Sequence, residues 1–168
     1  MSQRILDKEV ETQYLHIVLK ASGKGHYSDL WTFSPSKRKL LIEQMQRFLK
    51  LHAPFRLLGF SCMSNHIHIL LAVPKHYKYT RTEVVELHYQ CYGQKKRLHP
   101  NCSAIDKLRK DLNNVSAFAQ RFARDFAYWF NRGLKKFKRT GHLWSRRFHS
   151  TLLRSADSLL ECWKYVVF

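Results

Sequence analysis

The chain has 168 residues, of which 45% are hydrophobic, enough to bury a core within one compact domain spanning 1–168. Lys and Arg number 30 against 12 Asp and Glu, so the formal charge of +18 favours a polyanionic partner. The basic residues are dispersed among aromatic and apolar ones, without a hydrophobic span or a polybasic tail, so nucleic acid is favoured and a membrane is not expected.

The cysteines and the first residues indicate a chain that works inside the cell. Four cysteines lie far apart and form no C-x-x-C pair, which argues against a zinc ribbon or a disulfide framework. The amino-terminal residues lack a positively charged start followed by an apolar core, so nothing marks a secretion signal. We therefore expect reduced thiols and a cytoplasmic protein, associated with the nucleoid of a prokaryote.

The first half of the chain predicts a strand, a helix and a β-hairpin. Residues 13–20 alternate as a strand with both faces at least partly covered does. Ser34 and Pro35 are suited to begin a helix, which apolar residues at helical spacing carry to about Leu51. Two apolar β runs within 55–73 are separated by a polar Met-Ser-Asn turn, which predicts a hairpin.

A polar, basic and tyrosine-rich insert follows at 76–114. Within it "TRTEVVELHYQ" has helical character, and "GQKKRLHPNCS" is typical of a loop. The insert is either a clamp for a nucleic-acid stem or a surface elaboration of the fold.

The last third predicts a helix, a short strand and a final helix. Aromatic residues recur at helical spacing from Val115 to about Gly133, and this stripe is expected to pack in the core. "FHSTLL" has strand character, and Asp157 is a plausible cap for the helix that follows. The order of elements predicts an α+β fold in which helices cover one or both faces of a small antiparallel sheet.

The stretch "MSNHIHILL" places two histidines inside the second run of the hairpin. Because side chains alternate across a strand, His66 and His68 project from the same face, opposite to Ile67. Two neutral imidazoles on one face can hold a divalent metal once further ligands complete its shell. A pair of histidines that are only hydrogen-bonded is the alternative. No H-E-x-x-H motif accompanies them, so a zinc hydrolase is not indicated.

Several motifs together resemble those of the single-tyrosine HUH transposases, in particular the REP-associated tyrosine transposases. They are the pair in "NHIH", the segment "YWFNR", the Gly-x-x-Trp-x-x-Arg-Phe spacing in "RTGHLWSRRFHSTLL", and the tyrosine in "SLLECWKYVVF". The resemblance extends from Tyr14 to Phe168. It implies a ferredoxin-like sandwich whose central antiparallel sheet carries the H-x-H strand and is flanked by helices.

The same resemblance implies an activity. His66 and His68 match the residues that hold Mg²⁺ or Mn²⁺ in the family, and Tyr165 matches the nucleophile that forms a 5′-phosphotyrosine and releases a 3′ hydroxyl. We therefore expect metal-dependent nicking and joining of single-stranded DNA, at a hairpin formed by an imperfect palindrome. Tyr128 is the alternative nucleophile. Members of the family act as monomers or as homodimers, and both states are compatible with this chain.

One position departs from the family's pattern. The Asn or Gln that follows the tyrosine by four residues, and completes the metal site, would fall at position 169, so the resemblance predicts a chain truncated just past Tyr165. Glu161, one turn earlier, is a substitute ligand by its spacing, although an exposed helix Glu is the ordinary explanation. A DNA-binding protein that keeps the fold with impaired chemistry is therefore the alternative function.

Basic and aromatic residues interleave between the two last predicted helices, a combination that neutralises phosphates and stacks unpaired bases. Trp144 and Phe148 are expected to anchor this segment to the core rather than to contact DNA. The predicted DNA contacts are Lys135, Lys136, Lys138, Arg139, Arg146 and Arg147.

Overall fold

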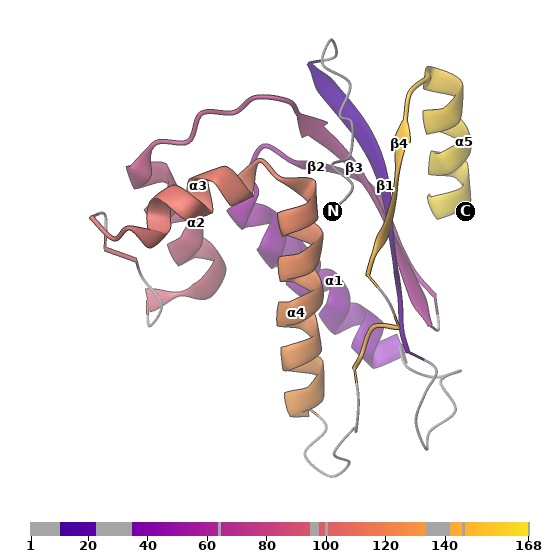
Figure 1. Cartoon of the computed structure of the whole chain (residues 1–168). Helices are drawn as coiled ribbons and strands as arrows, with labels where there is room; N and C mark the ends of the chain where they lie inside the picture. The colour runs from indigo at the N-terminus through magenta and orange to yellow at the C-terminus, as the bar shows by residue number, and fades with distance from the viewer. Residues whose placement is uncertain are drawn as a thin grey trace.

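The structure of the chain, a computed structural model, describes residues 11–22, 35–63, 65–94, 98–99, 101–133, 142–145 and 147–167. These ranges contain four strands and five helices, whose arrangement is drawn in Figure 1. In chain order they are β1 (Thr12–Lys20), α1 (Pro35–Leu51), β2 (Arg56–Cys62), β3 (His66–Pro74), α2 (Arg81–Tyr92), α3 (Ala104–Leu112), α4 (Val115–Gly133), β4 (His149–Leu153) and α5 (Ala156–Val167).

The strands form one sheet in the order β2-β3-β1-β4, and every neighbouring pair is antiparallel. Because β1 and β2 both run antiparallel to β3, they are parallel to each other and flank it, joined through α1. In the same way β3 and β4 flank β1 and are joined through α2, α3 and α4. Two such split β-α-β units make the ferredoxin-like topology, so the predicted α+β fold is confirmed.

The two faces of the sheet are covered by different helices (Figure 1). One face packs against α1 and α4, and the other carries α5. Alternation assigns Leu15, Ile17 and Leu19 to the α4 side, and all three are buried. The aromatic stripe of α4 lies in the same core, as predicted: Phe118, Phe122 and Phe126 are at most 2% exposed. None of the helices among the described residues is long and apolar enough to cross a membrane.

The insert at 76–114 holds more regular structure than the sequence reading expected. The helical character of its first part is confirmed by α2, whose Thr80 cap and Glu83 form a reciprocal capping box. A second helix, α3, was not predicted, although it buries Ile105, Leu108 and Leu112 at helical spacing. Arg81 of α2 binds Asp106 of α3 with a nitrogen–oxygen distance of 2.6 Å. The insert is therefore a helical pair that packs on α1 and α4 rather than a linker.

The cap of α5 differs from the prediction. Asp157 lies inside the first turn, whereas Ser155 precedes the helix and accepts a hydrogen bond from the Ser158 backbone N–H at 3.1 Å. The Ser158 hydroxyl in turn accepts from the Ser155 backbone N–H at 3.1 Å, which closes a reciprocal pair. Asp157 contributes its negative charge to the helix amino terminus instead. The predicted cap at Ser34 lies outside the described residues.

His52 at the end of α1 is fully buried among Phe48, Phe55 and Phe118, and its Nδ1–H donates to the Leu112 carbonyl at 3.0 Å. Burial lowers the pKa of this imidazole to about 3. Between about pH 3 and about pH 6.5, the ordinary pKa of histidine, the unfolded chain binds a proton at His52 and the folded chain does not. The free energy of unfolding therefore decreases as the pH falls below about 6.5.

We expect His52 to make the free energy of unfolding fall by up to about 1.4 kcal/mol per pH unit between pH 6 and pH 4. Denaturant unfolding across this range measures the slope. A His52→Gln chain, whose amide can still donate to Leu112, should show a slope smaller by about one proton. The exposed His142→Gln serves as the control, and an unchanged slope in His52→Gln would contradict the prediction.

Candidate active site

Three histidines and a tyrosine meet where α5 crosses the sheet. His16 comes from β1, His66 and His68 from β3, and Tyr165 from α5. The ring centroids of His66 and His68 are 4.8 Å apart, and Tyr165 presents its ring to His68 at 5.2 Å with an angle of 85° between the planes. His16 stacks on His68 at 5.1 Å. The structure thus brings together the histidines and the tyrosine that the sequence singled out.

The neighbours of the two predicted metal ligands engage the Nδ1 atom of each ring. His66 Nδ1–H donates to the Asn65 side-chain oxygen at 2.6 Å, which leaves the lone pair of His66 on Nε2. His68 Nδ1 lies 2.8 Å from His16 Nε2. If this hydrogen bond is donated by His68, its lone pair is also on Nε2. Metal-binding histidines commonly have their second nitrogen engaged in this way.

His68 Nε2 is the atom through which His68 would bind a metal. It is buried, and it has no hydrogen-bond partner among the residues that the structure describes. A buried polar atom without a partner is costly, and such atoms are uncommon in folded proteins. A nitrogen lone pair left in this state next to a second histidine fits a metal ligand. The histidine pair therefore fits a divalent cation through two imidazole nitrogens.

The electrostatics keep the imidazoles neutral. Burial, together with the neighbouring His16 and His66, lowers the pKa of His68 to about 4. The pKa of His66 is lowered by burial and by Lys20, and that of His16 by burial and by His149. Neutral imidazoles retain the lone pairs that coordinate a metal.

The donor set also limits the affinity for a cation. Within the described part of the chain, no three His, Cys, Asp or Glu side chains are arranged to hold a metal ion together. Mg²⁺ and Mn²⁺ prefer oxygen ligands, and two imidazoles alone make a weak site for them. Tight binding is therefore expected only when a phosphate group supplies oxygen ligands beside the two histidines.

An irregularity in β2 sets the position of α5. The register of β2 against β3 shifts between Leu57 and Gly59, so Leu58 pairs with no residue of β3. The Leu58 carbonyl instead accepts a hydrogen bond from Trp163 Nε1–H at 3.1 Å. Trp163 lies two residues before Tyr165, so this bond fastens the helix that carries the tyrosine to the edge of the sheet.

Gly59 allows α5 to approach β2 closely. A Cβ atom built at Gly59 would meet Val166 Cγ1 at 3.2 Å and Val167 Cγ2 at 3.4 Å, and Val166 is buried and has little room to move. Only the absence of a side chain at Gly59 lets the helix lie this low over the sheet. The height of Tyr165 above the histidines therefore depends on a residue in another strand.

We expect Gly59→Ala to destabilise the fold by about 1–3 kcal/mol, as overpacking of a filled contact does. The same substitution should slow any reaction of Tyr165, because it lifts α5 away from the histidines. Thermal unfolding gives the first effect and single-turnover kinetics the second. A Gly59→Ala, Val166→Ala double variant makes room for the added methyl group, and failure of both quantities to recover in it would contradict this steric account.

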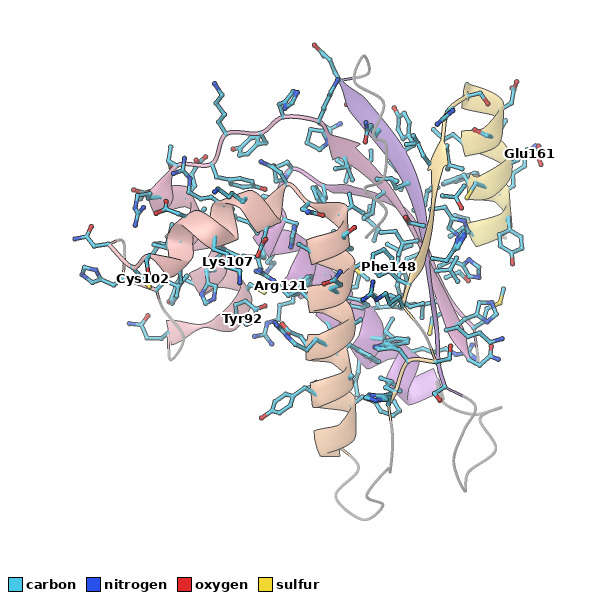
Figure 2. All side chains as sticks on the ribbon, in the orientation of Figure 1. Tyr92, Cys102, Lys107, Arg121, Phe148 and Glu161 are labelled. Carbon is cyan, nitrogen blue, oxygen red and sulfur yellow. The ribbon has the colours of Figure 1, made fainter. Side chains whose placement is uncertain are left out.

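Two alternatives from the sequence lie elsewhere. Tyr128 is on α4, on the opposite side of the sheet from α5, and its side chain is 64% exposed. Figure 2 shows Glu161 on the side of α5 that is turned away from the sheet. Its carboxylate binds Lys164 Nζ at 3.3 Å, and the side chain is 75% exposed. The structure brings neither residue to the histidines.

The predicted DNA contacts can be located only in part. Arg147 is exposed and follows the bridge between Ala21 and Trp144. The other five, Lys135, Lys136, Lys138, Arg139 and Arg146, lie outside the described residues. Trp144 is partly buried against Phe126, and its Nε1–H donates to the Ala123 carbonyl at 2.8 Å. The anchoring role expected for Trp144 is thus confirmed, and the same holds for Phe148, which packs against the core.

Sequence reasoning missed His16. The residue sits in "YLHIV" on the face of β1 opposite to Leu15 and Ile17, and a lone histidine at such a position is usually a surface residue. Its cross-strand partners are Leu70 and Thr151, so only the diagonal contact with His68 reveals a role. A prediction of the β1–β3 pairing together with its register would have been needed to find it.

No protein-family model matches the chain, and no curated protein matches its sequence. Among solved structures, the chain is similar to the 1.90 Å crystal structure of a "putative transposase" from Deinococcus radiodurans R1. The two share 14% sequence identity with a TM-score of 0.48, over 99% of this chain and 95% of that chain. Sequence identity this low does not tell which residues act here, so the function has to follow from the site itself.

Proposed function

We propose that this chain nicks and joins single-stranded DNA through a covalent phosphotyrosine, with Tyr165 as nucleophile and with His66 and His68 as ligands of Mg²⁺ or Mn²⁺. One observation carries the proposal: the Tyr165 ring lies 5.2 Å from His68, whose Nε2 is buried without a partner among the described residues. Phosphoryl transfer to a side chain requires that one phosphate can reach both the nucleophile and the bound metal.

The reaction follows from the residues in place. Tyr165 Oη attacks the phosphorus of a DNA phosphodiester, and the bond from phosphorus to the 3′ oxygen breaks. The phenolic proton is lost, and the departing oxygen takes up a proton to become a 3′ hydroxyl. The DNA on the 3′ side of the break stays linked to the tyrosine through its 5′ phosphate. Reversal by another 3′ hydroxyl joins two strands without ATP, because the phosphotyrosine conserves the energy of the bond.

His66 and His68 would hold the cation beside the phosphate that is attacked. A divalent cation bound there supplies Lewis-acid polarisation of the scissile phosphate. His66 and His68 stand on a central strand of the sheet, and Asn65 and His16 hold their rings, so their direction is set before DNA arrives. Tyr165 stands on a helix fastened at Leu58, so the nucleophile is positioned independently of the ligands.

The charge of the chain supports DNA as the substrate. A formal charge of +18 attracts any polyanion, and Arg147 exposes a guanidinium group two residues before β4. Binding that depends on Lys and Arg contacts with phosphates weakens steeply as salt is added. The basic segment before β4, predicted from its interleaved cationic and aromatic residues, belongs to the same proposal. So does a DNA hairpin as the preferred substrate, which the family resemblance implies.

The test is the formation of a covalent adduct. The chain is incubated with a labelled DNA hairpin bearing single-stranded flanks, with Mn²⁺ or with EDTA, and then denatured and separated by gel electrophoresis. We expect a labelled protein band only with the metal. Absence of the band with every hairpin in a randomised library, although the DNA is bound, would contradict the proposal and would favour the alternative, a DNA-binding protein with impaired chemistry.

A further inference from the structure

A cavity lies on the opposite side of the sheet from Tyr165. It has a volume of about 690 Å³ and is lined by residues of α1, α2, α3 and α4. The volume is in the range of sites that hold small organic molecules. Figure 2 shows Tyr92, Lys107 and Arg121 close to one another here, although they come from three different helices. We name this cavity the helical groove; its residues used below are Arg47, Tyr92, Lys107, Arg121, Arg124 and Tyr128.

The helical groove has a net positive charge. Four cationic side chains line it, against the two carboxylates of Asp111 and Asp125. Arg121 binds Asp111 at 3.3 Å, and Arg124 binds Asp125 at 3.0 Å. Both carboxylates are therefore matched by arginines, and the charges of the two remaining cations, Arg47 and Lys107, have no counter-charge among the residues that line the cavity. An anionic ligand would supply it.

Two side chains of the groove are ordered by contacts within the protein. Arg47 Nε–H donates to the Cys91 carbonyl, and the guanidinium group lies 5.9 Å from the centre of the Tyr92 ring. The Tyr92 hydroxyl donates to Asp125 at 2.7 Å, which fixes that ring as well. Groups that are already ordered lose little entropy when a ligand binds. Arg47 and Tyr92 are thus held in place before a ligand binds.

Aromatic rings accompany the cations. Tyr128 projects from α4 with 64% of its surface exposed, the largest exposed fraction among the exposed large hydrophobic residues in the described part of the chain. A flat ring beside arginines and a lysine is the combination that recognises an unpaired nucleotide, since the base stacks on the ring and the phosphate meets the cations. Duplex DNA keeps its bases stacked inside and does not offer them to such a ring.

We propose that the helical groove binds an unpaired nucleotide of a DNA strand, with its base on Tyr128 and its phosphate near Lys107. The inference rests on the proposed function in taking DNA as the polyanion. It adds a contact on the far side of the sheet from the reacting phosphate. A strand bound at both places would pass around the protein, and the groove would select DNA with single-stranded segments on either side of the reaction site.

Fluorescence anisotropy of the whole chain with a labelled oligothymidylate of about 12 nucleotides tests the groove. All variants carry Tyr165→Phe, so that no covalent reaction disturbs the equilibrium. Lys107→Glu should weaken binding at least fivefold more than Lys110→Glu, which makes the same change of charge on the same helix but outside the groove. Tyr128→Ala should weaken binding about tenfold, and Tyr128→Phe, which keeps the ring, should bind as the parent does.

Competition experiments identify the ligand of the groove. A free deoxynucleoside 5′-monophosphate should compete only at concentrations far above those of the oligonucleotide, and competition at equal concentration would assign the groove to free nucleotides instead. Equal losses for Lys107→Glu and Lys110→Glu, with no loss for Tyr128→Ala, would overturn the proposal. Absence of a covalent adduct in the unmodified chain, together with intact groove binding, would contradict the proposed function and leave the groove standing.

Discussion

Replacing Tyr165 by phenylalanine is expected to abolish the covalent DNA adduct while leaving the fold and the binding of DNA unchanged. Phenylalanine keeps the ring that faces His68 at 5.2 Å but lacks the oxygen that attacks phosphorus. Tyr165 is 59% exposed, and substitutions at such sites usually change stability by less than about 0.5 kcal/mol. The denaturing gel used for adducts gives the first result, and thermal unfolding gives the second.

Tyr128→Phe is the matched control for this prediction. It removes the hydroxyl of the other tyrosine considered as a nucleophile, which is also exposed and also on a helix, but on the far side of the sheet. We expect this variant to form the adduct as the unmodified chain does. An adduct that persists in Tyr165→Phe and disappears in Tyr128→Phe would reverse the assignment. Mass spectrometry of the linked peptide identifies the tyrosine directly.

We expect Tyr165→Phe to lose adduct formation completely rather than to form the adduct more slowly. A water molecule that replaces the tyrosine oxygen would hydrolyse the strand and leave no protein-bound product, so cleavage without an adduct remains distinguishable from true loss. Nucleophilic catalysis of this kind cannot be transferred to a neighbouring hydroxyl unless that group reaches the same phosphate. The described residues around Tyr165 on α5 include Lys164 and Val166, neither of which has a hydroxyl group.

Much of the fold could be predicted because its main signals are local. Alternation identified β1, an apolar run after a polar turn identified β3, and the three-four spacing of aromatic residues identified α4. The same alternation put His66 and His68 on one face, which the register confirms, since both lie opposite the buried Ile67. The helix α3 was not predicted, because its polar surroundings in sequence conceal three buried apolar residues that only the packing on α4 and α2 explains.

The candidate site was less predictable because its geometry depends on residues far apart in the chain. The bond from Trp163 to Leu58 spans 105 residues and needs an extra residue in β2 that no local pattern announces. His16 is separated from His68 by 52 residues and meets it only diagonally across two strands. The sequence thus predicted the reactive side chains. The contacts that position them depend on the register of the sheet and on where α5 packs against it.

His16 is expected to act on the proposed metal site through His68. The pair is joined by one hydrogen bond of 2.8 Å between His16 Nε2 and His68 Nδ1. We expect His16 to accept in this bond, which holds the His68 proton on Nδ1 and leaves the lone pair on Nε2. Removing the acceptor allows the proton to move to Nε2, where it blocks coordination. Changes to such supporting partners typically reduce metal affinity by about 10–100-fold.

We therefore expect His16→Phe, which fills a similar volume without an acceptor, to weaken Mn²⁺ binding by about 10–100-fold, and His68→Ala to remove it. His16→Gln, whose amide oxygen accepts, should recover part of the affinity. Electron paramagnetic resonance of Mn²⁺, titrated into Tyr165→Phe chains with uncut DNA, measures the affinity without any turnover, and nitrogen chemical shifts of the imidazoles report the tautomer. A purely structural role for His16 would leave the His68 tautomer unchanged. A shift of the His68 proton to Nε2 in His16→Phe, reversed in His16→Gln, would instead show that His16 controls the tautomer. Equal affinity in His16→Phe and the parent would refute the role of His16, whereas failure of the parent to bind Mn²⁺ would refute the metal site itself.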